Sequence, residues 1–409
     1  MQFKMNEPVD VLMCDVLPFR HSTRTRKMAL SIKQSSPQTR VRAVTLKRAG
    51  RVGFSDDRDL FQEEGVDVRQ VDVPEARQSS NYWTMLYNLV LVYPLGLYRL
   101  TREVSRTPSP VIVVGSTSLS WLGALHQRIH HSHCFVNARE RLGGIKTKGS
   151  IGTLVSRAEP LMLRYFARGD VTLTSVCDGH ADEFRAAGAR NVMVLRNLPR
   201  TDFGDHVFVP PPASDSPLCL VVVGSLYPGR GLEPLICAVS MLAERGRPVR
   251  LEISGHGSPV YMNALDRLAS AAPAGTVRLL GGCAPSEVHR RYQRGHVGTA
   301  LYEPVDAAND SLSNKLFESV ASGRPVLASN LTENSRVVSD YGIGWLTPVD
   351  IRGLMSAIDS LIEVRKELCE MGHNCHQLWL SNLNWQSEVQ PLVDAVLHNV
   401  SSMGGGEAR

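Results

Sequence analysis

A loop rich in glycine with one cation in it is the first feature of this 409-residue sequence that could do chemistry. It follows an apolar run at residues 221–223 and contains Gly224, Gly229, Arg230 and Gly231. Glycines let backbone amides approach an anion closely, a helix N-terminus adds partial positive charge, and Arg230 adds a full charge. The loop therefore predicts a phosphate site. Its spacing matches neither the dinucleotide-binding G-x-G-x-x-G nor the P-loop pattern, so a simple structural turn is the alternative interpretation.

Two carboxylates, eight positions apart, form a second candidate group. Asp310 is in a polar loop, and Glu318 is about one turn into the helix expected after it. Such a pair can accept hydrogen bonds from two sugar units of one elongated ligand. The residues between them offer helix N-caps and free backbone amides for phosphates: Leu312, Ser313, Asn314 and Lys315.

Strands that alternate with helices must position these residues. Apolar runs of strand length alternate with helical spacing in both halves of the chain, which predicts two α/β domains, each a doubly wound parallel sheet. Ligands bind such sheets at the carboxyl ends of the strands, so we expect two facing Rossmann-like domains with a cleft between them. The expected strands are residues 9–14, 41–46, 66–73, 111–115, 134–137, 171–174 and 191–195, then 218–223, 249–254, 277–280, 297–301 and 325–328.

A proline-rich segment, residues 201–217, separates the two expected domains. Proline lacks an amide donor and fixes its own backbone angle, so this segment is expected to be a linker. We place the N-terminal domain at residues 1–200 and the C-terminal domain at 218–380. A C-terminal helix at 381–400, crossing back to the first domain, and a disordered tail at 401–409 complete the expected organisation.

The composition indicates an ordinary globular protein. Hydrophobic residues make up 43% and charged residues 21% of the chain, which argues against a disordered or fibrous protein. The eight cysteines are scattered without a C-x-x-C pair, and no apolar stretch reaches membrane-spanning length, so we expect a cytoplasmic protein with reduced thiols. Cys369, His373, Cys375 and His376 lack the second ligand pair of a structural zinc site, so neither a metal nor a cofactor is predicted.

The motifs, in their order along the chain, resemble those of the group-1 glycosyl transferases, retaining enzymes with the GT-B fold. The glycine loop ends in Arg-Gly, a G-x-G follows the next strand at residues 255–257, and an acid, seven residues, acid pattern precedes A-x-G-x-P-V. The resemblance covers nearly the whole chain. It implies transfer of a sugar from a nucleoside diphosphate to an acceptor hydroxyl, with retained anomeric configuration and without a metal. UDP is the expected nucleotide, from its frequency in the family.

The resemblance also implies a role for each matching residue. Arg230 would contact the donor diphosphate, Asp310 would lie near the donor sugar hydroxyls, and Glu318 would hold the nucleotide ribose. These three are the expected catalytic residues. The other expected donor-binding residues are Gly224, Ser225, Gly229, Gly231, Gly255, His256, Gly257, Leu312, Ser313, Asn314, Lys315, Arg139 and Glu140.

Three positions depart from the family's pattern. Asp310 stands where Glu is usual. Ser225 stands where a second arginine is frequent, so the expected diphosphate site has lost a charge. Residues 137–140 match a segment commonly written D-A-H-E, with Arg139 in place of the histidine that approaches the donor sugar. Arg139 either restores the missing cation or indicates an altered donor.

The acceptor is expected on the first domain. Residues 1–200 contain 29 Lys and Arg against 18 Asp and Glu, a field that attracts an anionic acceptor or an acidic membrane face. The loop with Arg20, Arg24 and Arg26 is the expected acceptor-side site, and a solvated basic loop is the alternative. The apolar, aromatic residues 82–98 form either a core helix or a helix at the membrane interface. No nucleic-acid partner is expected, because no recognition motif accompanies the basic residues.

The acceptor's identity is open at this stage. A saccharide, a lipid-linked saccharide or a small metabolite would each fit, within cell-surface polysaccharide or glycolipid assembly at the inner face of the membrane. Two other functions also stay open. The chain could be a non-hydrolysing nucleotide-sugar epimerase, which needs no acceptor, or a catalytically inactive scaffold that only binds a nucleotide sugar.

Overall fold

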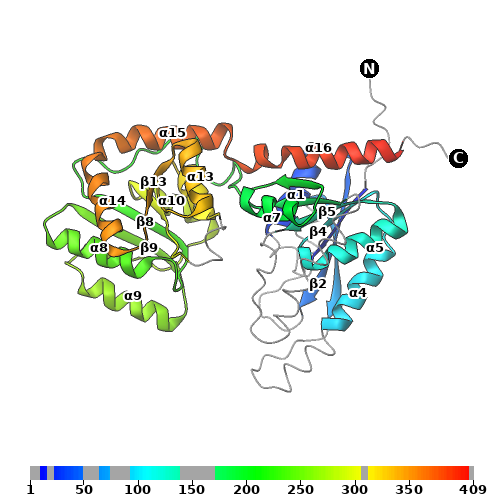
Figure 1. The fold of residues 1–409 in the computed structure, drawn as a ribbon, viewed down its shortest axis with the longest axis horizontal. Helices are drawn as coiled ribbons and strands as arrows, with labels where there is room; N and C mark the ends of the chain where they lie inside the picture. The colour runs from blue at the N-terminus through cyan, green and yellow to red at the C-terminus, as the bar shows by residue number, and fades with distance from the viewer. Residues whose placement is uncertain are drawn as a thin grey trace. The chain divides into compact units, whose positions relative to one another are not determined.

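The chain forms two compact units, seen here in a computed structural model (Figure 1). Unit 1 contains Met1–Leu195 and Val389–Arg409, and unit 2 contains Arg196–Glu388. The structure describes residues 10–15, 23–48, 64–73, 93–138, 171–304 and 312–404.

Unit 1 is built on a parallel sheet. Its seven strands follow the order β3-β2-β1-β4-β5-β6-β7, and every adjacent pair is parallel. Their bounds are β1 Asp10–Asp15, β2 Arg40–Arg48, β3 Val66–Val73, β4 Val111–Val114, β5 His133–Ala138, β6 Val171–Ser175 and β7 Asn191–Val194. The helices are α1 Thr23–Ser35, α4 Tyr93–Ser105, the short 3-10 turn η3 Thr117–Leu119, α5 Ser120–His130 and α7 Asp178–Ala186.

Alternation along the central strands places apolar side chains on both faces of this sheet. Leu12 and Cys14 of β1 share one buried cluster with Leu100 of α4 and Leu122 of α5. Helix α4 contains the last residues of the apolar segment at 82–98. Within it Leu97 packs against the same cluster, whereas Tyr98 is 63% exposed. The earlier residues of that segment lie outside the described residues.

Unit 2 repeats the plan with a six-stranded parallel sheet, in the order β10-β9-β8-β11-β12-β13. Its strands are β8 Leu218–Ser225, β9 Val249–His256, β10 Val277–Leu279, β11 Val297–Ala300, β12 Val326–Ser329 and β13 Gly344–Thr347. Its helices are α8 Leu232–Glu244, α9 Pro259–Ala271, η4 Pro285–Glu287, α10 Val288–Gln293, α12 Asn314–Ala321, α13 Thr332–Tyr341, α14 Ile351–Glu363, η5 Arg365–Glu367 and α15 Leu368–Ser381.

Strand β8 shows why this sheet is wound on both faces. Leu218, Leu220 and Val222 lie in a large buried cluster with residues of α8, α9 and α14. Cys219, Val221 and Val223 point the other way and pack with Tyr292 of α10. Because β8 is buried on both faces, successive positions along it carry apolar side chains, which explains the continuous apolar run in the sequence.

The structure differs from the expected organisation at two boundaries. The segment expected as a linker, residues 201–217, belongs to unit 2, where Arg324 donates to the carbonyl oxygens of Val209 and Pro210. The last helix, α16, spans Trp385–Gly404, so residues 401–404 are helical rather than part of a disordered tail. Serine and methionine are tolerated in a helix, and the glycine run that begins at Gly404 ends it.

Candidate functional site

Three glycines shape the loop between β8 and α8. Gly224, Gly229 and Gly231 have φ angles of 117°, 86° and 63°. These values lie in the left-handed region, which side chains with a Cβ atom rarely adopt. At Gly231, the N-cap of α8, a Cβ atom would also lie 2.5 Å from Cγ1 of Val349. The backbone path that presents Arg230 therefore requires glycine.

The loop after β8 meets the segment after β11 because these two strands are neighbours in the sheet. The amide of Glu303 donates to the carbonyl oxygen of Gly229 over 3.0 Å, which ties the two segments together. Helix α12 brings in a third segment, since the Lys315 side chain lies beside Gly224. A Cβ atom on that glycine would be 3.3 Å from Cε of Lys315.

Arg230 presents unused hydrogen-bond donors in this corner. Its Nε and Nη1 atoms are buried without a hydrogen-bond partner among the described residues. Its Cζ atom lies 4.2 Å from the ring centroid of Tyr227 and 4.2 Å from that of Tyr302. Burial lowers the pKa of the guanidinium, and Tyr227 acts in the opposite direction. A buried guanidinium with free donors has the chemistry to bind an anion.

Lys315 adds a second cation to the same corner. Its side chain is buried, and burial together with the nearby charge of Arg230 lowers its pKa to about 8. Glu318, one turn further along α12, raises the pKa of Lys315 and so lies close enough to interact with it. Two neighbouring cations in a partly desolvated corner would each be stabilised by an anion bound between them.

The first turn of α12 supplies backbone donors. Ser313 is its N-cap, and the helix begins at Asn314, so the first amides of the helix lack intrahelical acceptors. The Ser313 hydroxyl donates to the Tyr302 hydroxyl over 3.4 Å, and Leu312 before it is half-buried. The N-terminus of α12 thus adds partial positive charge beside Lys315.

The expected G-x-G segment lies next to the glycine loop at the end of β9. Ser225 pairs with His256 in the sheet, and Gly224 pairs with Gly255. Gly255 and Gly257 allow close approach, because Cβ atoms on them would lie 1.9 Å from the carbonyl oxygen of Gly224 and 2.4 Å from that of Leu226, respectively. His256 is exposed, and its ring lies directly against Gly282.

The structure therefore gathers most of the expected donor-binding residues at the carboxyl edge of the unit 2 sheet. The expected residues Arg20, Arg139, Glu140 and Asp310 lie outside the described residues. In unit 1, Arg24 is buried and donates to the carbonyl oxygen of Ser175 over 3.2 Å. Arg26 forms an ion pair with Glu64 at 2.8 Å. Both arginines are thus engaged within unit 1.

A comparison of the sequence with protein-family models found a match that covers the unit 2 residues described above. Residues 217–364 match the sequence model of the family described as glycosyl transferases group 1. The chain carries a group 1 glycosyl transferase domain. The matched residues include the glycine loop, Lys315 and Glu318, so the corner with two cations lies inside this domain.

Solved structures show the same fold across nearly the whole chain. Sucrose-phosphate synthase from Thermosynechococcus elongatus is 13% identical, with a TM-score of 0.70 over 96% of this chain and 100% of that one. HepE from Anabaena, in complex with UDP, is 14% identical, with a TM-score of 0.68 over 96% and 100%. A glycosyltransferase from Rickettsia africae is 13% identical, with a TM-score of 0.66 over 96% and 99%. No curated protein matches the sequence. The GT-B fold class predicted from the sequence is confirmed.

Sequence reasoning missed the role of the two tyrosines beside Arg230. Tyr227 lies inside the glycine loop, and Tyr302 is the second residue after β11. An aromatic residue in a loop has no periodicity to reveal its partner. The position of the two tyrosines along the chain could have indicated that they lie close together. Each tyrosine lies in a segment that follows one of two adjacent strands, and such segments meet at the ligand-binding edge of a parallel sheet.

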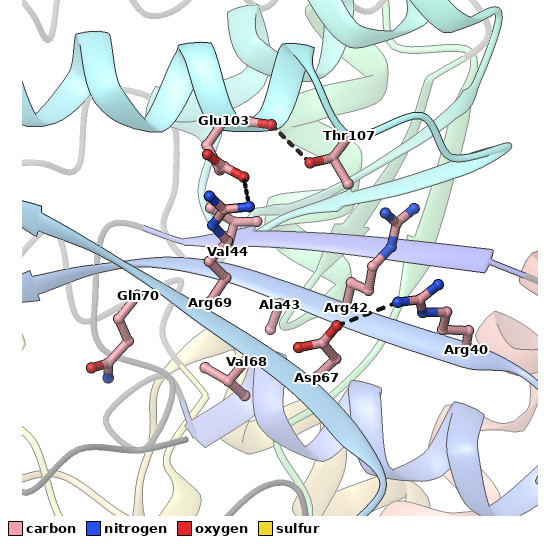
Figure 2. Close-up of a pocket in the computed structure, with 10 residues that line it drawn as sticks. All are labelled: Arg40, Arg42, Ala43, Val44, Asp67, Val68, Arg69, Gln70, Glu103 and Thr107. Atoms are coloured by element: carbon pink, nitrogen blue, oxygen red, sulfur yellow. Dashed lines mark hydrogen bonds and ion pairs between the residues drawn. The ribbon is translucent and has the colours of Figure 1, made fainter. Parts of the chain in front are cut away.

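A hollow in unit 1 is lined by residues of β2, β3 and α4 and by Thr107 after α4 (Figure 2). Arg40 pairs with Asp67 at 3.7 Å and Arg69 with Glu103 at 2.5 Å, and Arg42 pairs with Asp10. Each arginine that lines this hollow thus has an acidic partner. The hollow also lies near the start of β2 and β3, at the opposite end from the edge where parallel sheets bind ligands. It does not resemble the corner around Arg230.

Within the described ranges, no group of three or more His, Cys, Asp or Glu side chains is arranged to hold a metal ion. Over the same residues, no helix combines the length and the apolar character needed to cross a bilayer.

Proposed function

We propose that this protein transfers a sugar from a nucleoside diphosphate sugar, UDP-linked, to an acceptor hydroxyl. The observation that carries the proposal is the corner of unit 2 in which Arg230 and Lys315 lie together with unused guanidinium donors. UDP is favoured because the similar HepE structure contains it, and because another structural relative is bound to UDP-2-fluoro glucose.

The proposed catalysis depends on stabilising the negative charge that develops on the leaving diphosphate. When the glycosidic bond to the diphosphate breaks, negative charge grows on the leaving phosphate oxygen. Arg230, the Lys315 ammonium and the first amides of α12 would meet this charge, and their interaction strengthens as it grows. A charged hydrogen bond in such a site contributes about 1.5–3 kcal/mol. These groups stabilise the leaving group without a metal ion, so activity is expected to persist in EDTA.

The other expected residues take roles around this leaving group. Glu318 is placed one turn beyond Lys315 on α12, where it would accept hydrogen bonds from the nucleotide ribose. Asp310 would contact the donor sugar hydroxyls. We propose retention of the anomeric configuration, with the acceptor proton taken by the leaving phosphate oxygen on the same face of the sugar.

For the acceptor we propose a saccharide or a lipid-linked saccharide that reaches the protein at the inner face of the cell membrane. The support is the basic excess of residues 1–200. The internal contacts of Arg24 and Arg26 mean that this proposal does not rest on them. Within the loop expected on the acceptor side, it rests on Arg20.

The test is a donor screen followed by product analysis. Thermal unfolding is recorded with a panel of nucleoside diphosphate sugars, because a donor that binds the folded state raises its stability. The donor with the largest shift is then incubated with an acceptor panel, with and without EDTA, and the anomeric configuration of the product is read by NMR. We expect a retained glycoside in both conditions. An epimerised sugar from donor alone, or binding without turnover over the whole panel, would refute the transferase proposal.

A further inference from the structure

The guanidinium of Arg230 lies against two aromatic rings at once. Its Cζ atom is 4.2 Å from the ring centroids of both Tyr227 and Tyr302, inside the distance at which a cation is attracted to a ring face. Tyr227 is 44% exposed, so its ring does not belong to the hydrophobic core. We refer to Tyr227 and Tyr302 together as the tyrosine cradle.

Backbone and side-chain contacts hold the cradle in place. The amide of Glu303, next to Tyr302, donates to the carbonyl oxygen of Gly229, next to Arg230. The Tyr302 hydroxyl accepts from Ser313 at the N-cap of α12, over 3.4 Å. Tyr302 therefore touches both the loop that carries Arg230 and the helix that carries Lys315.

The tyrosine cradle stabilises the positive charge of Arg230 beside a second cation, Lys315. Arg230 lies close enough to Lys315 to lower the pKa of that lysine, so the two cations repel each other, and Glu318 offsets part of this effect at Lys315. A carboxylate against Arg230 would offset this repulsion, but it would also occupy the guanidinium donors. An aromatic face attracts the cation without accepting its N–H groups in the guanidinium plane. In agreement, Nε and Nη1 of Arg230 have no hydrogen-bond partner within the part of the chain that the structure describes, although the guanidinium also has a side-chain hydrogen bond with Tyr227.

We propose that Tyr227 and Tyr302 are positioning residues, which hold Arg230 with its donors free for the two phosphates of the donor nucleotide. This inference rests on the proposed function and deepens it. The cradle also compensates for Ser225, which leaves Arg230 as the one cation of the glycine loop. With a single loop cation, the orientation of its guanidinium determines how well both phosphates are held.

Matched variants separate the ring from the hydroxyl. Tyr227→Phe and Tyr302→Phe keep the ring face, whereas Tyr227→Leu and Tyr302→Leu remove it. Titration calorimetry with UDP and with inorganic pyrophosphate should show binding within about threefold of wild type for the Phe variants. It should show a loss of about tenfold for each Leu variant, in the range of one cation–π contact. Thermal unfolding of all four variants checks that they fold.

A cycle with Arg230 distinguishes positioning from a general structural effect. In the Arg230→Ala background the Tyr→Leu changes should alter pyrophosphate affinity by less than about twofold, because the group they position is gone. Equal losses in both backgrounds would overturn the inference. The inference would also be overturned if the Leu variants bind as tightly as the wild type while Arg230→Ala binds more weakly. This result would leave the proposed function intact.

If binding depends on the tyrosine cradle but no sugar is transferred, the proposed function is refuted and the inference about the cradle stands. A wild-type protein that binds neither probe would refute both.

Discussion

At the scale of single residues, the site combines buried cationic groups whose burial costs free energy unless a ligand interacts with them. Arg230 is partly buried with unused donors, and Lys315 is buried beside it with a lowered pKa. Burial of polar groups without partners costs free energy, and such groups concentrate where a protein binds something. The local arrangement of these cations therefore indicates an anion as the missing partner.

Lys315 should make nucleotide binding depend on pH. Its pKa of about 8 in the free protein means that it loses its proton as pH rises through 8, and a bound diphosphate raises that pKa again by favouring the charged form. UDP affinity should therefore be constant well below pH 8 and fall above it, by up to about tenfold per pH unit. Calorimetric titration of UDP between pH 7 and 9.5 measures this.

The matched control for that experiment is Lys315→Arg. A guanidinium stays charged over the whole range, so the decline above pH 8 should disappear in this variant even if its affinity at pH 7 differs. A wild-type profile that is flat to pH 9.5 would show that Lys315 does not face the diphosphate.

The residue scale also shows where sequence reasoning reaches its limit. Arg230 and Lys315 could be proposed for a phosphate site from the sequence, because a cation among glycines and a cation at a helix N-terminus are each suited to bind a phosphate. Tyr227 and Tyr302 could not, since their role depends on a contact between segments that are 75 positions apart in the sequence. Arg24 shows the opposite error. A basic loop predicts surface charge, but tertiary packing buried this arginine against the end of β6.

At the scale of elements, strands were predictable wherever an apolar run is buried on both faces, as in β8 and β4. Strand β13 was missed because Gly-Trp-Leu-Thr is neither a β-branched run nor an alternating pattern. The segment 201–217 was interpreted as a linker from its prolines alone. Its attachment to unit 2 comes in part from Arg324, which the sequence shows only as a variable position of A-x-G-x-P-V, and in part from the contact of His376 with the Asp205 carbonyl oxygen.

Arg324 should be essential for the stability of unit 2. It is fully buried, and its five N–H groups contact six backbone carbonyl oxygens, two of which share one N–H, including those of Val209, Pro210 and Gly295. Lysine has too few donors to replace it, so Arg324→Lys should lower the free energy of unfolding by at least about 3 kcal/mol, as carbonyls lose partners. Chemical denaturation measures the change. Arg267→Lys, on an exposed arginine with one backbone contact, is the control and should stay within about 0.5 kcal/mol. Equal stability of the two variants would contradict this role.

The N-terminus of α8 should not accept a side chain at its N-cap. Gly231→Ala combines left-handed strain with overlap against Val349, so we expect a loss of about 2–3 kcal/mol in the free energy of unfolding, together with weaker UDP binding as Arg230 shifts. Gly246 also has a positive φ, of 76°, but has open space around it. Gly246→Ala should cost about 1 kcal/mol and leave UDP affinity unchanged. If the two variants behave alike, the packing around Gly231 does not determine the loop.

At the scale of the whole molecule, net charge is a poor guide to the proposed donor site. Residues 201–409 contain 16 Lys and Arg against 22 Asp and Glu, yet this acidic half carries Arg230 and Lys315. The basic excess lies in residues 1–200, where the described arginines around the hollow of Figure 2 are paired with acids. The anion site is therefore proposed from local placement at the carboxyl edge of a parallel sheet and not from the net charge of the surrounding sequence.

Arg230 is the residue on which the proposed sugar transfer depends most, and the turnover of a variant without its guanidinium is the most direct test. With the donor identified by the stability screen, kcat/KM for sugar transfer is measured for the wild type and for Arg230→Ala, after thermal unfolding has shown that both are folded. Loss of about 2 kcal/mol of transition-state stabilisation predicts a kcat/KM at least about 30-fold lower in the variant. A folded Arg230→Ala protein that transfers sugar as fast as the wild type would contradict the central claim.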